Sequence, residues 1–159
     1  MKLKIICVGK LKEKFYTAAV NEFTKRISRF AETVIIEVPD ESAPEKSSAA
    51  DIEKVKCIEG TRILEKLSPG ETLIALDIAG KQLSSVEFSE KIQDYMLSGK
   101  SRLVFAIGGS NGLSQEVLNR ADFRLSFSRM TFSHQIFRTM LLEQLYRAFK
   151  IINNEPYHK

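Results

Sequence analysis

The hydrophobic positions of the chain form two alternating patterns, short apolar runs and longer amphipathic segments. The short runs are typical of buried strands, and they lie at Lys2–Val8, Thr33–Val38, Glu71–Asp77, Arg102–Ile107 and Phe123–Phe127. The longer segments are typical of helices that bury one face. In the first of them the apolar residues recur at helical spacing, at Tyr16, Ala19, Val20, Phe23, Ile27 and Phe30.

Serines mark where the other helices begin. A serine hydroxyl can accept a hydrogen bond from the free N–H groups of the first helical turn. Ser47 or Ser48 precedes a helix predicted to reach about Leu67, and Ser84 or Ser85 precedes one predicted to reach about Leu97. Ser114 precedes a short helix, and Ser133 precedes the last helix, which is predicted to reach about Ile152. Gly80 is expected to turn the chain after the third strand. Strands that alternate with helices predict an α/β fold, with a mostly parallel sheet and flanking helices.

The last predicted helix, from near Ser133 to about Ile152, is apolar on more than one face. Its apolar residues are Ile136, Phe137, Met140, Leu141, Leu142, Leu145, Tyr146, Phe149, Ile151 and Ile152. A helix outside a sheet needs only one apolar stripe. The remaining faces could be covered by a second copy of the chain, or the helix could lie at the centre of its own core. We favour the first arrangement, which predicts a homodimer.

The composition is that of an ordinary globular domain. The chain has 159 residues, of which 43% are hydrophobic and 28% charged, enough for one domain with its own core. No apolar run approaches the ~18 residues that a membrane span needs, and the apolar run at the start is too short for a secretory signal. Cys7 and Cys57 form no C-x-x-C pair, so both are expected to be reduced, buried thiols. We therefore expect a cytoplasmic protein without membrane association.

The charge is unevenly distributed. Lys and Arg outnumber Asp and Glu eight to two in residues 1–29 and eight to four in residues 102–159, whereas residues 30–60 carry three against eight. Two basic ends around an acidic middle are typical of a surface that faces a polyanion. A set of solvated helix faces would give the same distribution.

A glycine-rich stretch, Gly108-Gly109-Ser110-Asn111-Gly112, follows the fourth predicted strand. Glycine allows tight turns and close approach of the backbone to a ligand. The spacing is neither G-x-G-x-x-G nor G-x-x-x-x-G-K-[ST], so the two common phosphate-binding loops are absent. The stretch is either a simple turn or a loop for a ligand without a phosphate chain.

Several motifs in the same order resemble the RlmH family, small bacterial SPOUT-class methyltransferases that modify large-subunit ribosomal RNA. The motifs are VGKLKEKFY near the start, then FAIGGSNGL, LSFSRMTFSHQ, LLEQLYRAFKI and the terminal PYHK. The resemblance covers the whole chain and implies a single SPOUT methyltransferase domain over residues 1–159. It also implies a C-terminal trefoil knot, although knots are rare in protein chains.

The resemblance further implies an activity and its partners. The cofactor would be S-adenosylmethionine, held in the knot, with no metal ion. The protein would act as a homodimer and would methylate N3 of a pseudouridine in 23S rRNA of the assembled 70S ribosome. The family's cofactor contacts correspond here to Leu76, Gly108, Phe127, Ser128, Arg129, Met130, Thr131 and Phe132. They would grip a neutral nucleoside and a sulfonium, which explains the missing phosphate cradle.

The remaining candidates concern proton transfer and RNA. Removal of the N3 proton calls for a base, and the resemblance places the tail in the substrate site, which makes His158 and Tyr157 the catalytic candidates. A loose chain end is the alternative for this tail. A helix N-terminus disfavours the cation of His134, and a structural hydrogen bond is expected for this residue rather than catalysis. Candidates for contacts to RNA are Arg129, Arg138 and Lys159.

The sequence departs from the family pattern at one position, where Ser133 replaces the usual proline before the histidine. Serine can still cap the helix, but the turn is less rigid. The main rival function is a non-catalytic RNA-binding or ribosome-assembly factor on the same fold. A nucleotide-binding oxidoreductase is more distant, because the acidic residue that follows a dinucleotide fingerprint is missing.

Overall fold

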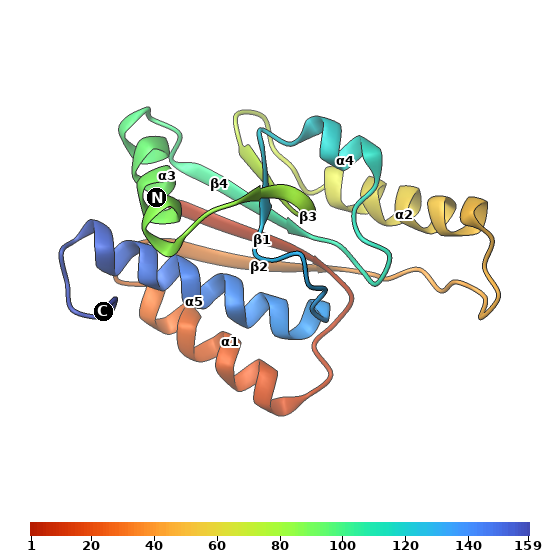
Figure 1. Ribbon diagram of the computed structural model, residues 1–159, viewed down its shortest axis with the longest axis horizontal. Helices are drawn as coiled ribbons and strands as arrows, with labels where there is room; N and C mark the ends of the chain where they lie inside the picture. Colours follow the sequence, from red (N-terminus) through yellow and green to blue (C-terminus); the bar gives the residue numbers. More distant parts are fainter.

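The computed structural model describes residues 1–159 as a sheet of five strands with helices on both faces (Figure 1). The strands are β1 (Lys2–Val8), β2 (Glu32–Val38), β3 (Thr72–Gln82), β4 (Arg102–Ile107) and β5 (Phe123–Ser126). The helices are α1 (Lys14–Ile27), α2 (Ala49–Leu64), α3 (Ser85–Leu97), α4 (Gln115–Arg120) and α5 (His134–Ile152). All pairings are parallel, in the order β2-β1-β4-β3-β5. The predicted α/β class is confirmed.

The central strands bury both of their faces, because successive side chains point to opposite sides of the sheet. In β4, Leu103, Phe105 and Ile107 join a core formed with α1, α3 and α5. The alternate residues Val104 and Ala106 join a second, smaller core formed with α2 and α4. Continuous apolar strands are typical of such two-sided burial.

The predicted serine caps are confirmed. Ser48, Ser84, Ser114 and Ser133 each precede a helix and accept a hydrogen bond from an N–H of its first turn. Helix α2 ends at Leu64, three residues before the predicted end at about Leu67.

The third strand does not end at Asp77 as predicted but continues to Gln82. Its pairing with β5 shifts from Leu76 to Lys81, so the residues between them bulge out of the ladder. A Cβ on Gly80 would lie 2.7 Å from the backbone of Arg124, so only glycine fits this bulge against β5. The glycine was recognised as a turn residue, but an apolar pattern carries no signal for a strand that resumes after a bulge.

Helix α5 lies between α1 and α3 on one face of the sheet (Figure 1). Leu141, Leu142, Leu145 and Phe149 are fully buried within this single chain. Most of the apolar surface of α5 is therefore covered without a second copy of the chain. This agrees with the alternative in which the helix lies at the centre of its own core. The homodimer stays a prediction that this helix alone does not require.

Two further features bear on the sequence predictions. No helix is both long and apolar enough to cross a membrane. Cys7 is buried and burial raises its pKa to about 12, but Cys57 is only half-buried, which corrects the expectation for that residue. The trefoil knot and the single domain over residues 1–159 stay predictions from the resemblance.

Candidate functional site

A pocket of about 610 Å³ lies where β3, β4 and β5 lead into their following segments. Ligands of open α/β sheets usually bind outside the carboxyl ends of parallel strands. Three separate stretches line it, around Leu76, around the glycine-rich loop and from Leu125 to His134. Seven of the eight predicted cofactor residues line this pocket, namely Leu76, Gly108, Phe127, Ser128, Met130, Thr131 and Phe132. Arg129 is exposed and does not line it.

The glycine-rich loop closes on itself rather than simply leaving room for a ligand. Gly112 donates its N–H to the carbonyl of Gly109, 3.1 Å away, and adopts a φ of +83°, which favours glycine. A Cβ on Gly108 would lie 2.7 Å from the backbone carbon of Gly112. The glycine at 108 is therefore needed by the turn itself, and its role toward the cofactor stays a prediction.

A buried carboxylate supports this loop from behind. Glu59 of α2 is 4% exposed, and its Oε1 accepts a hydrogen bond from the N–H of Glu41 at 3.0 Å. Its Oε2 has no hydrogen-bond partner, and a Cβ on Gly109 would lie 3.0 Å from it. Burial raises the pKa of this carboxyl group. The sequence carried no signal for this role, because a glutamate inside a polar helix segment normally faces solvent.

The lining of the pocket suits an uncharged or cationic ligand better than a phosphate. It combines apolar side chains with serines and the carboxylate of Asp77, and it contains no Lys or Arg. One oxygen of Asp77 is held by Arg124 through Nε at 2.9 Å. Ser128 shapes the turn after β5, since its hydroxyl accepts the N–H of Met130 at 3.0 Å. No cluster of His, Cys, Asp or Glu that could hold a metal ion is present.

His134 lines the same pocket at the first turn of α5, where the sequence suggested a structural residue. Burial lowers the pKa of its imidazole, and the charges of Arg138 and Lys12 act in the same direction while Asp40 opposes them. The side chain is therefore largely neutral at neutral pH. Its ring also approaches Gly9, where a Cβ would lie 3.3 Å from Nε2.

Arg138 was a candidate for contacts to RNA phosphates, and the structure contradicts this. Its side chain is 1% exposed and forms an ion pair with Glu37. It also donates a hydrogen bond to the carbonyl of Gly9. The guanidinium therefore ties the loop after β1 to α5 inside the fold. Arg129 and Lys159 are exposed and remain available.

The C-terminal tail folds back against α5, which corrects the view of a tail without packing. The Tyr157 hydroxyl donates to Glu143 Oε1 at 3.1 Å, and its ring meets that of Tyr146 edge-on with 4.9 Å between centroids. Arg147 lies 4.6 Å over the Tyr157 ring and 3.3 Å from His158 Nδ1. Burial and the Glu143 carboxylate raise the pKa of Tyr157, so its phenol is neutral at neutral pH.

The two halves of the predicted site lie apart within one chain. The pocket adjoins the first residue of α5, whereas the tail follows the last. The tail runs back along α5 and contacts Glu143 and Arg147. These residues follow His134 by nine and thirteen positions, so at 1.5 Å per residue they lie roughly 14–20 Å along the helix from the pocket. Figure 1 shows the last turn of α5 at the left edge of the molecule and its first turn near the middle. The structure brings the cofactor candidates together but leaves His158 and Tyr157 remote from them.

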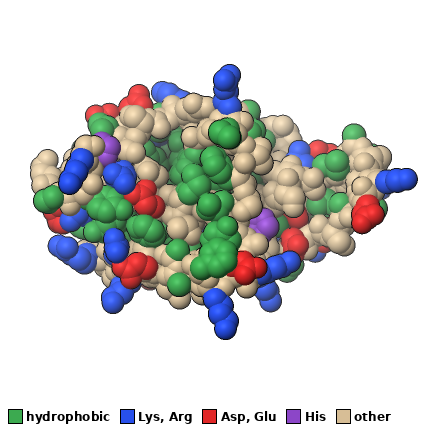
Figure 2. All heavy atoms as spheres, turned by 60° about the horizontal axis from the view of Figure 1, so that its bottom comes forward, with side chains coloured by type: hydrophobic (Ala, Val, Ile, Leu, Met, Phe, Trp, Pro, Cys, Tyr) green, Lys and Arg blue, Asp and Glu red, His purple; other side chains and the backbone are tan.

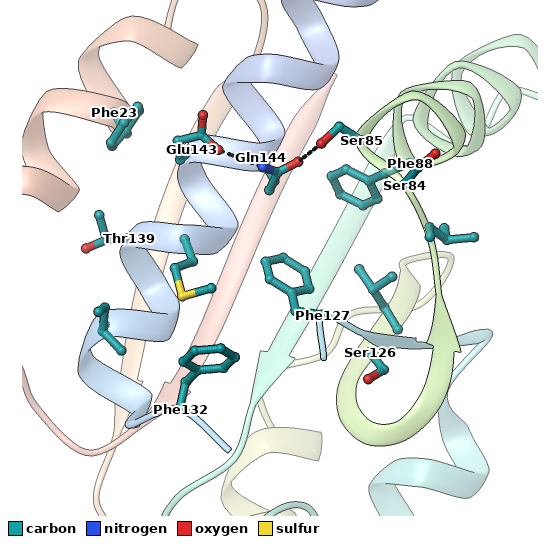
Figure 3. A pocket seen from close by; sticks show the side chains of 14 residues that line it. Phe23, Ser84, Ser85, Phe88, Ser126, Phe127, Phe132, Thr139, Glu143 and Gln144 are labelled. Atoms are coloured by element: carbon teal, nitrogen blue, oxygen red, sulfur yellow. Dashed lines mark hydrogen bonds between the residues drawn. The ribbon is translucent and has the colours of Figure 1, made fainter. Parts of the chain in front are cut away.

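A second hollow, of about 650 Å³, opens beside α5 (Figure 3). Its lining includes Ile136 and Met140 of α5. Figure 3 shows Phe132, Phe127 and Phe88 of α3 around it. Its polar edge is a short chain in which Ser85 donates to Gln144 and Gln144 donates to Glu143, both at 2.8 Å. Figure 2 shows hydrophobic side chains gathered in a central band on this side of the molecule.

Comparison with known proteins gives consistent matches over the full length. A family described as "Predicted SPOUT methyltransferase" matches residues 1–158. The chain is 55% identical to the ribosomal RNA large subunit methyltransferase H of Carboxydothermus hydrogenoformans, over 100% of both chains. It is 53% identical to the protein of the same name in Enterococcus faecalis, again over 100% of both chains.

A solved structure supports the fold. The chain is similar to a probable methylase family protein from Haemophilus influenzae, with a TM-score of 0.58 and 15% sequence identity. The match covers 99% of this chain and 70% of the other. At this identity the likeness concerns the arrangement of strands and helices alone.

Proposed function

The chain belongs to the SPOUT methyltransferase family, and from this membership we propose that it methylates N3 of a pseudouridine in 23S rRNA of the assembled ribosome. The methyl donor is S-adenosylmethionine. Action on assembled 70S ribosomes would place the protein in the cytoplasm.

One observation carries the proposal, the pocket that gathers nearly all the predicted cofactor residues from three separate segments. Its volume of about 610 Å³ lies within the roughly 300–1,000 Å³ of small-molecule sites. The lining has no cation for a phosphate, and it offers Oδ1 of Asp77, whose Oδ2 is held by Arg124, to a positively charged group. These residues fit a neutral nucleoside that carries a sulfonium.

The cofactor, when bound, supplies an electrophilic methyl group. The residues of the chain have three tasks around it. Leu76, Phe127 and Phe132 offer apolar contact to the nucleoside, and the turn that Gly108 permits lets main-chain groups approach it. The walls exclude water and hold the acceptor nitrogen in line with the methyl group, which lowers the entropic part of the barrier.

The acceptor N3 must lose its proton, and the tail is the proposed source of the base. His158 is exposed and can accept that proton, while the neutral phenol of Tyr157 can orient the base of the RNA. Because neither Tyr157 nor His158 lines the pocket of its own chain, the tail would serve the pocket of a partner. A homodimer with antiparallel α5 helices would bring the two together.

The hollow beside α5 supports such a dimer. It is lined by Ile136, Met140 and other side chains that remain partly exposed in the single chain. Apolar patches of this kind are typical of interfaces. The rival, a non-catalytic RNA-binding or assembly factor, would not need a pocket whose lining matches the cofactor candidates.

The proposal is tested first by calorimetry with S-adenosylmethionine and with NAD. We expect binding of the first and none of the second, because the lining offers nothing to a pyrophosphate. Methyl transfer to 70S ribosomes should then far exceed transfer to a short naked RNA hairpin, because the protein has no base-reading module. Raised salt should suppress the transfer.

Mass spectrometry of 23S rRNA identifies the product. RNA from a strain that lacks the protein should be missing one methyl group on one pseudouridine, and purified protein should restore it. Binding of S-adenosylmethionine without transfer to any ribosomal particle would favour the assembly factor. Absence of cofactor binding would refute the enzyme.

A further inference from the structure

We propose that residues 10–15, here called the lysine loop, are an RNA-docking edge beside the cofactor pocket. Lys10, Lys12 and Lys14 would contact phosphates, and Phe15 would stack on an unpaired base. The inference rests on the proposed function, since the RNA is the ribosomal substrate. It adds a binding surface that none of the earlier candidates for contacts to RNA includes.

The lysine loop presents its cations outward because its one aliphatic residue points inward. Leu11 packs against the large core, and its N–H donates to Glu37 Oε1 at 3.1 Å. The neighbours Lys10 and Lys12 are both exposed, as expected where successive side chains point to opposite sides of an extended chain. Lys14, the first residue of α1, is exposed as well.

The lysine loop is fixed at the rim of the pocket by contacts to the start of α5. The N–H of Lys12 donates to Gln135 Oε1 at 3.1 Å. Just before the loop, the carbonyl of Gly9 accepts a hydrogen bond from Arg138. Ser133 and His134, which precede Gln135, line the cofactor pocket. The influence of the Lys12 charge on the pKa of His134 agrees with this placement.

The three ammonium groups are free to bind an anion. None of Lys10, Lys12 and Lys14 forms an ion pair or a side-chain hydrogen bond within the chain, whereas the nearby carboxylate of Glu37 is already paired with Arg138. Exposed acids remain close by at Glu13 and Asp40, so the surface is not uniformly basic. Figure 2 shows Lys and Arg side chains around the border of the hydrophobic band on this side.

An exposed aromatic ring stands next to these cations. Phe15 is 63% exposed, and its ring lies 4.4 Å from that of Tyr16 between centroids. A phenylalanine on the solvent side of a helix adds nothing to the core. Proteins that recognise unpaired RNA bases stack them on such rings while cations hold the backbone. Lysines beside a nucleoside pocket, with an exposed ring on the adjoining first turn of α1, fit single-stranded RNA.

The test compares two triple variants that lose the same charge. The first carries Lys10→Gln, Lys12→Gln and Lys14→Gln. The control carries Lys46→Gln, Lys54→Gln and Lys66→Gln, three exposed lysines that form no ion pair and lie before, on and after α2. Binding to 70S ribosomes is measured by sedimentation over a range of salt concentrations, and binding of S-adenosylmethionine by calorimetry.

We expect the lysine-loop variant to bind ribosomes at least about tenfold more weakly, with a salt dependence reduced by roughly two to three counterions. Its melting temperature and its affinity for S-adenosylmethionine should match those of the wild type, and the control should bind ribosomes within about twofold of it. Phe15→Ala should weaken ribosome binding without changing the salt dependence, and Phe15→Tyr should retain it.

Three results would overturn the inference. They are wild-type ribosome binding by the lysine-loop variant, an equal loss in the control, or no ribosome binding by the wild type. The proposed function fails separately, if the wild type binds no S-adenosylmethionine or transfers no methyl group. If the wild type methylates ribosomes and the lysine-loop variant binds them equally well, the docking edge is refuted and the proposed function stands.

Discussion

The protonation of the buried carboxyl group of Glu59 depends on the fold. Burial raises its pKa, and the hydrogen bond from the Glu41 N–H opposes this shift. The charge of Asp40 also raises the pKa, and that of Arg62 lowers it. The folded chain therefore holds this proton more tightly than the unfolded chain does. Stability should fall as the pH rises from the ordinary carboxyl pKa of ~4.3 through the raised value.

The variant Glu59→Gln tests this linkage. Glutamine keeps the shape of the side chain and can form hydrogen bonds without a charge. The melting temperature of the variant should therefore rise relative to that of the wild type as the pH increases across that window. Thermal melts at several pH values between 4 and 8 give the difference, with Glu65→Gln as an exposed control on the end of the same helix. A constant difference at every pH would show that the carboxyl group titrates normally.

Individual residues also show where sequence reasoning reached its limit. The pattern identified Gly108 as special but could not choose between a turn and a ligand loop, because the clash with Gly112 depends on how the turn closes. The family motif placed seven cofactor candidates in one pocket, whereas Arg138 looked like a free cation until the fold buried it. Contacts between distant segments, such as Arg138 with Gly9, have no local signature.

At the scale of elements, the apolar pattern and the serine caps predicted every helix and strand, since both signals are local. The bulge in β3 and the position of α5 between α1 and α3 could not be predicted, because they depend on what packs alongside. The tail after α5 is the clearest case. Its residues have no apolar periodicity, yet Tyr157 packs on α5 through Tyr146 and Arg147.

Within the tail, Tyr157 should therefore act in packing and His158 in the chemistry. Tyr157→Ala should lower the stability by about 1–2 kcal/mol, because it removes a half-buried ring and its hydrogen bond to Glu143. His158→Ala should leave the melting temperature nearly unchanged, since the side chain is exposed, while methyl transfer falls by roughly 10²-fold.

Thermal melts and single-turnover methylation of ribosomes at saturating cofactor separate the two effects. Tyr157→Phe is the matched variant, because it keeps the ring and loses only the hydroxyl group. Unchanged transfer by His158→Ala would remove the imidazole from the mechanism. A large fall in its melting temperature would instead show that His158 is structural.

At the scale of the whole molecule, the separation of pocket and tail makes the oligomeric state a functional question. Light scattering at micromolar concentration should give about twice 18.0 kDa. Met140→Glu places a charge in the hollow beside α5 and should yield a monomer that still binds S-adenosylmethionine but transfers no methyl group. Leu97→Glu, at a residue 80% exposed on α3, is the control and should remain dimeric. An active monomer would contradict the shared site.

The position of α5 also determines when this protein can first work during its own synthesis. Leu141, Leu142, Leu145 and Phe149 complete the core between α1 and α3, and Lys2 of β1 pairs with Arg102 of β4. Contacts so far apart in the chain form late and slowly. A nascent chain lacks its innermost helix until residues 134–152 have been synthesised. The protein can therefore fold, and become active as a methyltransferase, only after α5 has been synthesised.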